Sequence, residues 1–228
     1  MRRGQIRATV TTETGSTITR SVVGHDNDIL SARASLNGVI FDISGNRNRI
    51  EINPGSQLSN VTFYIRGDDH TIVIGSGCIL SSYVSFVVED DHCHIHVGDR
   101  TAMYGYTTIA ALERTRVEIG NDCLFAYNVE IRSSDSHSIL DVKSKQRLNP
   151  AKDIGIGNHV WIGSHAIVLK GATIHDDSIV AAGAVVTKLE GEKGVIIAGN
   201  PARIIRRNVT WTHERNYRKQ ETSVGRTE

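Results

Sequence analysis

His137 lies in a polar stretch of the sequence, SSDSHS, that begins at residue 133. An imidazole has a pKa near ~6.5, so at neutral pH it can take the proton of a hydroxyl group that attacks an electrophile. Asp135 precedes it by two residues and is placed to fix the tautomer of the ring. The plainer alternative is an exposed loop histidine beside a turn-forming aspartate. The residues alone leave both interpretations open for His137, the candidate general base, and for Asp135, its candidate orienting residue.

Trp161 is the second candidate. It precedes Ile162, one of the aliphatic residues that recur every six positions, and alternation along a strand turns it outward. A large exposed aromatic side chain needs a cover, either a ligand or another part of the protein. His159 also faces outward by alternation and His165 lies near a bend; neither receives a role.

The third candidate is a group of histidines with the spacing H-x-H-x-H, formed by His92, His94 and His96. Alternation places all three on the outer face of one strand. A zinc site needs three or four ligands in tetrahedral geometry, which one strand face does not provide. We therefore predict no metal site.

The element that positions these residues is a six-residue repeat between Ile154 and Thr187. Every sixth residue is aliphatic, and the residue four places later is small: Ile156, Ile162, Val168, Ile174, Val180 and Val186, with Val160, Ala166, Ala172, Ser178 and Ala184. An α-helix has 3.6 residues per turn and does not fit this period. A short strand plus a corner does, if three such units close one coil of a solenoid.

The N-terminal half carries the same pattern in a longer unit of about 22 residues. Segments such as GDDHTI and EDDHCHI place Ile29, Ile50, Ile72, Ile95 and Val117 in register. Six-residue steps from the aliphatic residues that follow predict further inward positions, among them Leu58, Tyr64, Leu80, Phe86, Met103, Ile109, Phe125 and Ile131.

The register breaks once, at residues 133–153, which carry His137 and no six-residue period. A projecting loop within a regular array is more often functional than accidental. We expect a lead-in at 1–23, a solenoid at 24–207 and a tail at 208–228. A short basic helix from Ile204 to about Lys219 is predicted to cap the open end.

Composition limits the function classes. The formal net charge is +1, which argues against a nucleic-acid partner. The three cysteines show no metal-ligand spacing, and Cys78 and Cys123 fall at small positions of the repeat, so we expect buried thiols. A signal peptide or a membrane-spanning run is not recognised, so the expectation is a cytoplasmic protein with no membrane span.

These motifs resemble the hexapeptide-repeat acyltransferases. The resemblance rests on Gly157 and Gly163 in IGNHVWIGSHA, on Gly183 in VAAGAVVTK, and on AGNPAR at 198–203. Within that family the chain is most similar to O-acetyltransferases that modify sugars and polysaccharides. The resemblance implies an all-β fold, a left-handed parallel β-helix, and assembly into homotrimers.

It also implies roles for particular residues. The family's catalytic histidine corresponds to His137, and the tryptophan of its VWIG element, which lines the tunnel for the acetyl donor, to Trp161. Acetyl-coenzyme A is the implied donor and a sugar or polysaccharide of a bacterial capsule or surface the implied acceptor. The implied donor-binding residues are Gly163, Ala181, Ala182, Gly183, Lys188, Pro201, Ala202 and Arg203.

Two other functions remain open at this point. The γ-type carbonic anhydrases share the fold and bind zinc through histidines of separate rungs and two subunits. A solenoid can also serve only for assembly, although the irregular loop with His137 and the outward Trp161 count against this. The sequence does not decide which sugar hydroxyl is modified, or between O- and N-acetylation.

Overall fold

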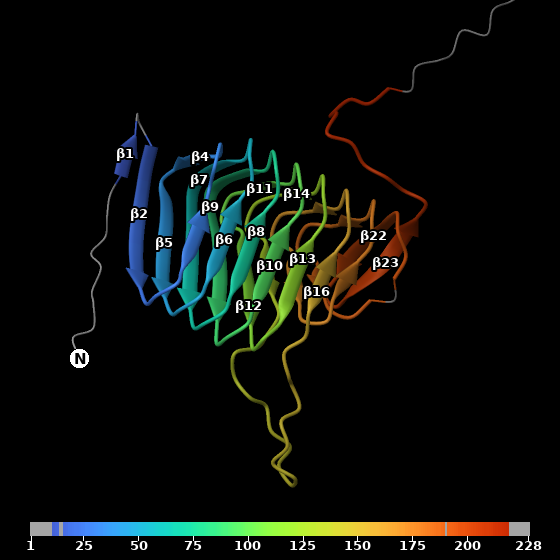
Figure 1. Ribbon diagram of the computed structural model, residues 1–228. Coiled ribbons are helices and arrows are strands. Elements are labelled where there is room, and N and C mark those ends of the chain that lie inside the picture. The colour runs from blue at the N-terminus through green and yellow to red at the C-terminus, as the bar shows by residue number, and fades with distance from the viewer. Residues whose placement is uncertain (1–10, 14–15, 190, 219–228) are drawn as a thin grey trace, which may run out of the picture.

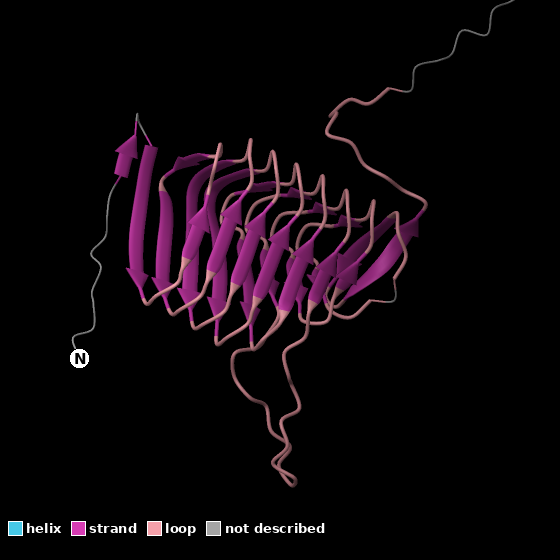
Figure 2. Cartoon of the chain, viewed as in Figure 1, coloured by secondary structure: helices cyan, strands magenta, loops and turns pink. Residues whose placement is uncertain are grey.

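The chain folds into a parallel β-helix whose coils have three flat faces (Figure 1), as a computed structural model of residues 11–13, 16–189 and 191–218 shows. Every element in this part of the chain is a strand, turn or loop (Figure 2). Helices long and apolar enough to cross a bilayer are therefore absent from the described residues.

Face 1 is a parallel sheet of seven strands, in the order β3 (Asp28–Leu30), β6 (Arg49–Ile52), β8 (Thr71–Ile74), β10 (His94–Val97), β13 (Arg116–Ile119), β16 (Ile154–Ile156) and β19 (Thr173–Ile174). Successive strands are one coil apart, so Ile50, Ile72, Ile95 and Val117 stack in register.

Faces 2 and 3 belong to one sheet that bends round a corner, because β7 (Gln57–Arg66) and β9 (Ile79–Glu89) each run along both faces. Face 2 adds β4 (Ser35–Asn37), β11 (Ala102–Tyr104), β14 (Leu124–Phe125), β17 (Trp161–Ile162), β20 (Ile179–Val180) and β22 (Val195–Gly199). Face 3 adds β2 (Ser16–Val23), β5 (Val39–Ser44), β12 (Thr108–Leu112), β15 (Glu130–Arg132), β18 (Ile167–Leu169) and β21 (Val185–Val186).

The interior confirms the predicted columns. All six aliphatic positions of the repeat and all five small positions are buried. Three phenylalanines of the N-terminal coils, Phe41, Phe63 and Phe86, stack at 5.1 Å between ring centroids, and their column continues through Ile109 and Ile131. A buried aliphatic side chain contributes roughly 1.5–3 kcal/mol, so these columns hold the coil together.

Tyr64 was predicted to point inward and does not; Phe63 is buried in its place. The corner at Asn60 contains one residue fewer than the corner at Ser82 and Tyr83, which shifts the register between β7 and β9. The step from Leu58 to Phe63 is therefore five residues, whereas the matching step from Leu80 to Phe86 is six.

Side-chain oxygens tie one corner of each coil to the next. Between faces 1 and 2, each backbone N–H donates to the Asp or Asn of the following coil at 2.7–2.8 Å, in the series Ser76, Asp99, Asn121, Asn158 and Asp176. A like ladder at the corner of faces 3 and 1 runs from the N–H of His25 through Asn46 and Asp68 to Asp91, which explains why Asp and Asn recur at the 22-residue spacing.

The three cysteines are buried and free, as predicted, and burial raises the pKa of each thiol. At Cys123 the burial raises the pKa to about 11.

The predicted C-terminal helix is wrong. Residues 202–207 form β23 (Ala202–Arg207), which pairs antiparallel with β22, and residues 208–218 are irregular. The chain can reverse at Gly199-Asn200-Pro201, and the strand that follows satisfies the open edge of β22. At the other end, β1 (Thr11–Glu13) pairs antiparallel with β2, so part of the predicted lead-in joins the sheet. Residues 1–10 and 219–228 lie outside the described residues.

Candidate functional site

The loop that carries His137 leaves the coil between β15 and β16, at the corner of faces 3 and 1 (Figure 1). Its first residue, Ser133, is buried: the hydroxyl accepts the N–H of Leu112 at 3.0 Å and lies 2.6 Å from Thr115 Oγ1. Lys152 returns the chain to the coil, where its N–H donates to Ser133 O at 3.0 Å. Both ends of the loop are therefore joined at Ser133.

Glu113, which lies one coil before the loop in the chain, braces the loop. Its carboxylate accepts hydrogen bonds from both terminal nitrogens of Arg147 and from the Ser134 hydroxyl. The Arg147 guanidinium, with the Ser134 hydroxyl, lowers the pKa of Glu113 to about 2. This ion pair joins the returning strand of the loop to the coil, and charge-assisted paired hydrogen bonds of this kind are among the strongest in proteins.

Asp135, in the loop, ties it to the following coil, which carries Lys170. Its carboxylate pairs with the Lys170 ammonium and accepts the Asn149 side-chain N–H at 2.7 Å. Lys170 and then Asn149 lower the pKa of Asp135. Asp135 therefore holds the loop against the coil, and the side-chain hydrogen bonds of its carboxylate go to Asn149 and Lys170.

His137 itself is held by its backbone. Its N–H donates to Asp135 O at 2.7 Å and its carbonyl accepts from Asn149 Nδ2 at 2.8 Å. The ring is exposed, and the hydrogen bonds found among the described residues include none from it. The structure thus presents the imidazole outward from a fixed backbone position.

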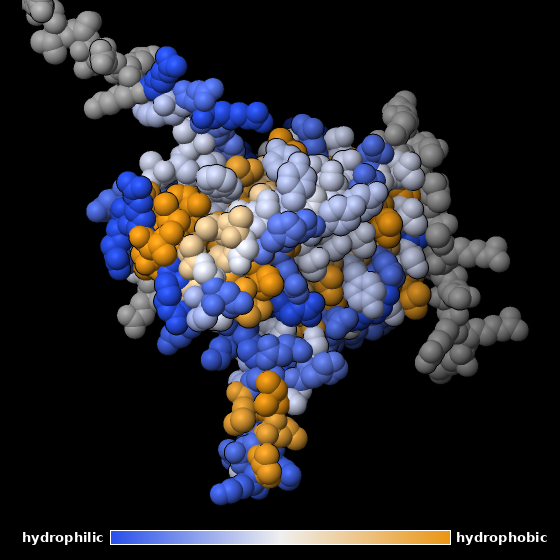
Figure 3. All heavy atoms as spheres, turned by 180° about the vertical axis from the view of Figure 1, so that it is seen from behind, coloured by the Kyte–Doolittle hydropathy of each residue, from blue (hydrophilic) through white to orange (hydrophobic). Residues whose placement is uncertain are grey.

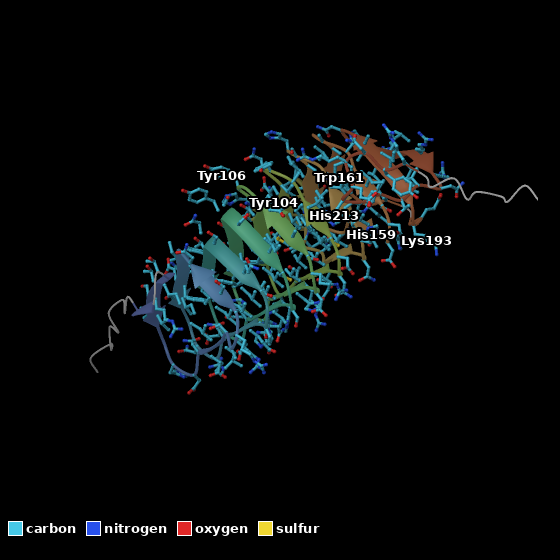
Figure 4. All side chains as sticks on the ribbon, turned by 90° about the horizontal axis from the view of Figure 1, so that it is seen from above. Tyr104, Tyr106, His159, Trp161, Lys193 and His213 are labelled. Atoms are coloured by element: carbon cyan, nitrogen blue, oxygen red, sulfur yellow. The ribbon has the colours of Figure 1, made fainter. Side chains whose placement is uncertain are left out.

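Trp161 lies on face 2 and points outward, as alternation predicted; 39% of its surface is exposed. The corner before it holds His159, whose Nδ1 lies 2.9 Å from Asp177 Oδ1. In Figure 4, His159, Trp161 and His213 lie together over the C-terminal part of the coil.

Sequence reasoning missed Trp211. This residue stacks on His159 at 4.4 Å between ring centroids and lies 6.1 Å from Trp161. Its indole N–H donates to His159 O at 2.7 Å. Local pattern gives no signal for this contact, because the partners are 52 residues apart in the chain.

The two candidate catalytic residues lie on different sides of one coil. His137 extends from the corner of faces 3 and 1, and Trp161 faces away from face 2, the side opposite that corner. A single chain therefore does not bring them together.

The predicted small residues lie at the corner of faces 2 and 3. A Cβ at Gly163 would lie 2.7 Å from Ala182 N and 2.9 Å from Val180 O, so close packing of the coils requires this glycine. Gly183 differs: φ is +70°, and a Cβ there would meet open space. Ala182 and Gly183 are exposed, and the N–H of Ala182 has no acceptor within the described residues. An extended ligand has room and a backbone donor here.

The remaining predicted donor-binding residues lie at the last coil. Lys188 is exposed beyond β21, which contacts β23. Pro201 and Arg203 are exposed, whereas Ala202 is fully buried in the core. Ala202 therefore supports the end of the coil, while Lys188 and Arg203 offer charge to solvent.

The side chains of the H-x-H-x-H segment have separate partners. His92 occupies a left-handed corner position and lies 3.7 Å from Asp69 Oδ2, while His96 lies 3.3 Å from Glu118 Oε2. Burial lowers the pKa of His94. Across residues 11–13, 16–189 and 191–218, no three His, Cys, Asp or Glu side chains gather as metal ligands.

Comparisons with known proteins agree with this architecture. Residues 153–188 match the family model "Bacterial transferase hexapeptide (six repeats)". The chain is 38% identical over 116 residues to a polysialic acid O-acetyltransferase of Escherichia coli O1:K1, covering 50% of this chain and 37% of that one. It is 31% identical to a polysialic acid O-acetyltransferase of Neisseria meningitidis, covering 52% and 55%. The matched segment thus spans about half or less of these relatives.

Two solved structures match over most of their length. The polysialic acid-specific acetyltransferase NeuO superimposes with a TM-score of 0.76 at 27% identity, covering 91% of this chain and 92% of that one. The polysialic acid O-acetyltransferase OatWY superimposes with a TM-score of 0.67 at 26% identity, covering 88% and 94%. The solenoid predicted from the repeat is confirmed, and so is the left-handed parallel β-helix that the family resemblance implied.

Proposed function

We propose that the chain acts as the bacterial hexapeptide transferases that residues 153–188 match, and that it transfers an acetyl group from acetyl-coenzyme A to a hydroxyl of a sugar. One observation carries the proposal: the only long break in the described coil presents His137 on a loop braced by two ion pairs. A solenoid used only for assembly has no need of such a brace.

His137 is the general base. Its exposed imidazole accepts the proton of the acceptor hydroxyl while the hydroxyl oxygen bonds to the acetyl carbon. The C–S bond of the thioester then breaks, and the imidazolium gives that proton to the departing thiolate sulfur. General base catalysis of this kind typically contributes ~10²–10⁴-fold. Acetyl-coenzyme A supplies an activated thioester, and the sequence offers no motif for a covalent enzyme intermediate.

The donor arm lies along the corner of faces 2 and 3. The room beside Gly183 and the free N–H of Ala182 support this placement, since an amide N–H can hold either an amide carbonyl of the arm or a developing oxyanion. Lys188 and Arg203 are proposed to pair with the donor's phosphates. Gly163 contributes through packing, because its neighbours leave no space for a side chain.

The active site forms between two chains of a homotrimer. His137 and Trp161 lie on opposite sides of one coil, so a site with both residues needs His137 from one chain and Trp161 from its neighbour. The loop also ends in an exposed apolar tip (Figure 3), made by Ile139, Leu140, Val142 and Leu148. An apolar tip of this kind favours contact with another protein surface.

The acceptor is proposed to be a polysaccharide of a bacterial capsule or surface. The two relatives and two structures compared above are named for polysialic acid, which supports a polymeric acidic sugar.

The test is thiol release from acetyl-coenzyme A by purified protein, with a sialic acid oligomer, a galactoside and an amino sugar as acceptors. We expect acceptor-dependent release, and a hundredfold or greater loss of kcat in His137→Ala. Ser138→Ala, one residue further along the exposed loop, is the matched control and should keep its activity. Release that is absent with every acceptor, or unchanged in His137→Ala with the trimer intact by light scattering, would refute the assignment.

A further inference from the structure

The chain has two tryptophans in 228 residues, and both line the same hollow on face 2. Trp161 lies on β17, and Trp211 lies on the segment that follows β23. Their ring planes are inclined by 45° with centroids 6.1 Å apart. Nothing in the mechanism above uses Trp211.

The segment that carries Trp211 is docked on the coil. Val209 N–H donates to Gly194 O at 3.0 Å, and Thr210 Oγ1 lies 3.3 Å from Asp177 Oδ1. Trp211 is 8% exposed, and its indole is fixed by the stacking on His159 and the hydrogen bond to His159 O. Residues 209–215, called the wall below, are therefore held beside Trp161 by contacts with the coil.

The hollow between wall and coil has a volume of about 460 Å³. Ligand sites typically occupy about 300–1,000 Å³ and combine an apolar lining with a few polar groups. Here the coil supplies an apolar floor, made by Leu124 and Trp161. The wall supplies Trp211 and a polar rim, made by Thr212, His213, Glu214 and Arg215.

We infer that this hollow is the acceptor subsite, which binds one sugar ring of the glycan on the exposed indole of Trp161. The inference rests on the proposed transferase function. A pyranose ring presents an apolar C–H face that packs on an aromatic ring, and hydroxyl groups at its edge. His213, Glu214 and Arg215 supply hydrogen-bonding partners for those hydroxyls.

Topology separates this subsite from the donor. β17 runs from the corner of His159 to the corner after Gly163, and the wall covers the first of these corners. The donor groove proposed above, along Ala182 and Gly183, lies at the second corner. Donor and acceptor thus reach Trp161 from opposite ends of one short strand, which is the arrangement that a direct transfer requires.

The rim carries both a permanent cation, Arg215, and an anion, Glu214. An acidic sugar would pair its carboxylate with Arg215, while a neutral sugar would use either residue through its hydroxyls. Comparing a sialic acid oligomer with a galactoside therefore separates the two modes.

Because both tryptophans line the hollow, intrinsic tryptophan fluorescence reports on this site. Titration of the full chain with a sialic acid oligomer or a galactoside, without donor, should give a saturable change in emission. Trp211→Phe leaves Trp161 as the single reporter and should retain the change with weaker affinity. Absence of any change with both acceptors, in a protein that acetylates one of them, would overturn the inference.

Kinetics give the second readout. We expect His213→Ala and Arg215→Ala to raise the acceptor KM by about tenfold, as loss of a hydrogen bond to a substrate does, with the donor KM within twofold. Tyr217→Ala is the matched control, since Tyr217 is exposed on the same segment and does not line the hollow. A rise in the donor KM instead would assign the hollow to the donor and refute the inference. Wild-type protein without transfer to any acceptor would contradict the proposed function, whereas normal transfer with an unchanged acceptor KM in both variants contradicts only the subsite.

Discussion

Glu113→Gln tests whether the brace on the loop positions His137. The substitution keeps the size of the side chain and removes the charge that pairs with Arg147. In the folded protein the pKa of Glu113 falls from 4.5 to about 2. Each pKa unit corresponds to about 1.4 kcal/mol, so the full shift corresponds to about 3.5 kcal/mol. Solvent screens this partly exposed pair, so the brace contributes no more than about 3 kcal/mol to the loop's attachment.

Loss of this ion-pair free energy should make local opening of the loop more frequent. Ile139 N–H donates to Asn149 Oδ1 and Leu148 N–H donates to Ile139 O, both at 2.7 Å, so these amides exchange only when the loop base opens. An energy of about 3 kcal/mol corresponds to a change of about 100-fold in an opening equilibrium. We expect protection of residues 137–149 in Glu113→Gln to fall 10- to 100-fold at pH 7, with a parallel loss of kcat and little change in donor KM.

The pH dependence has a defined sign. Because the folded pKa is lowered, the stabilisation is complete above the unfolded value near 4.5 and is lost as the pH falls toward about 2. Protection in the wild type should approach that of Glu113→Gln over this range.

The control is Asp69→Asn, which removes the charge partner of Arg47 in a comparable paired contact on another coil. It should leave the loop amides protected. Equal protection in Glu113→Gln and wild type at pH 7, within twofold, would refute the argument that this ion pair holds the loop.

Three further predictions follow from the geometry. Gly163→Ala should destabilise the coil by about 1–3 kcal/mol in denaturant unfolding, because its Cβ would lie 2.7 Å from a backbone nitrogen. Gly183→Ala should fold at a cost of about 1 kcal/mol and should raise the donor KM. A larger loss of stability in Gly183→Ala than in Gly163→Ala would contradict both assignments. Cys123 should resist a thiol reagent at pH 8 until the protein unfolds, since burial raises its pKa to about 11. Mixing His137→Ala and Trp161→Ala chains before assembly should restore about one quarter of the wild-type sites if each site draws on two chains; no recovery would show that one chain supplies both residues.

The sequence predicted the coil well, because its signal is a simple period. A buried aliphatic such as Ile162 or Val168 must recur whenever the chain completes one face, so spacing alone locates the interior. Tyr64 departs from this period, because the corner before it is one residue shorter and brings Phe63 inward instead. The corner between Leu58 and Phe63 turns on a single residue in the left-handed conformation, Asn60. Asn adopts that conformation in many contexts, so the sequence does not reveal the length of the corner.

The C-terminal segment could not be predicted for a different reason. Its strand β23 is stabilised by the edge of β22, and its wall by contacts of Trp211 with His159, so nothing in the segment's own pattern specifies either one. Glu113 could have been found: the register of the 22-residue unit places it at the corner directly before the loop. An acidic residue there, with Arg147 in the loop, is a detectable pair once the coils are aligned.

The reversal at β23 also bears on end-to-end association of coils. A coil that ended on a parallel strand would offer an unpaired backbone edge onto which a second molecule could add its own coils, end to end, without limit. β23 runs against the direction of every coil before it and is the last strand of its sheet in the described chain. Arg203 and Arg206 are exposed along it and Arg207 pairs with Glu192, so an approaching coil meets a charged strand of the wrong polarity.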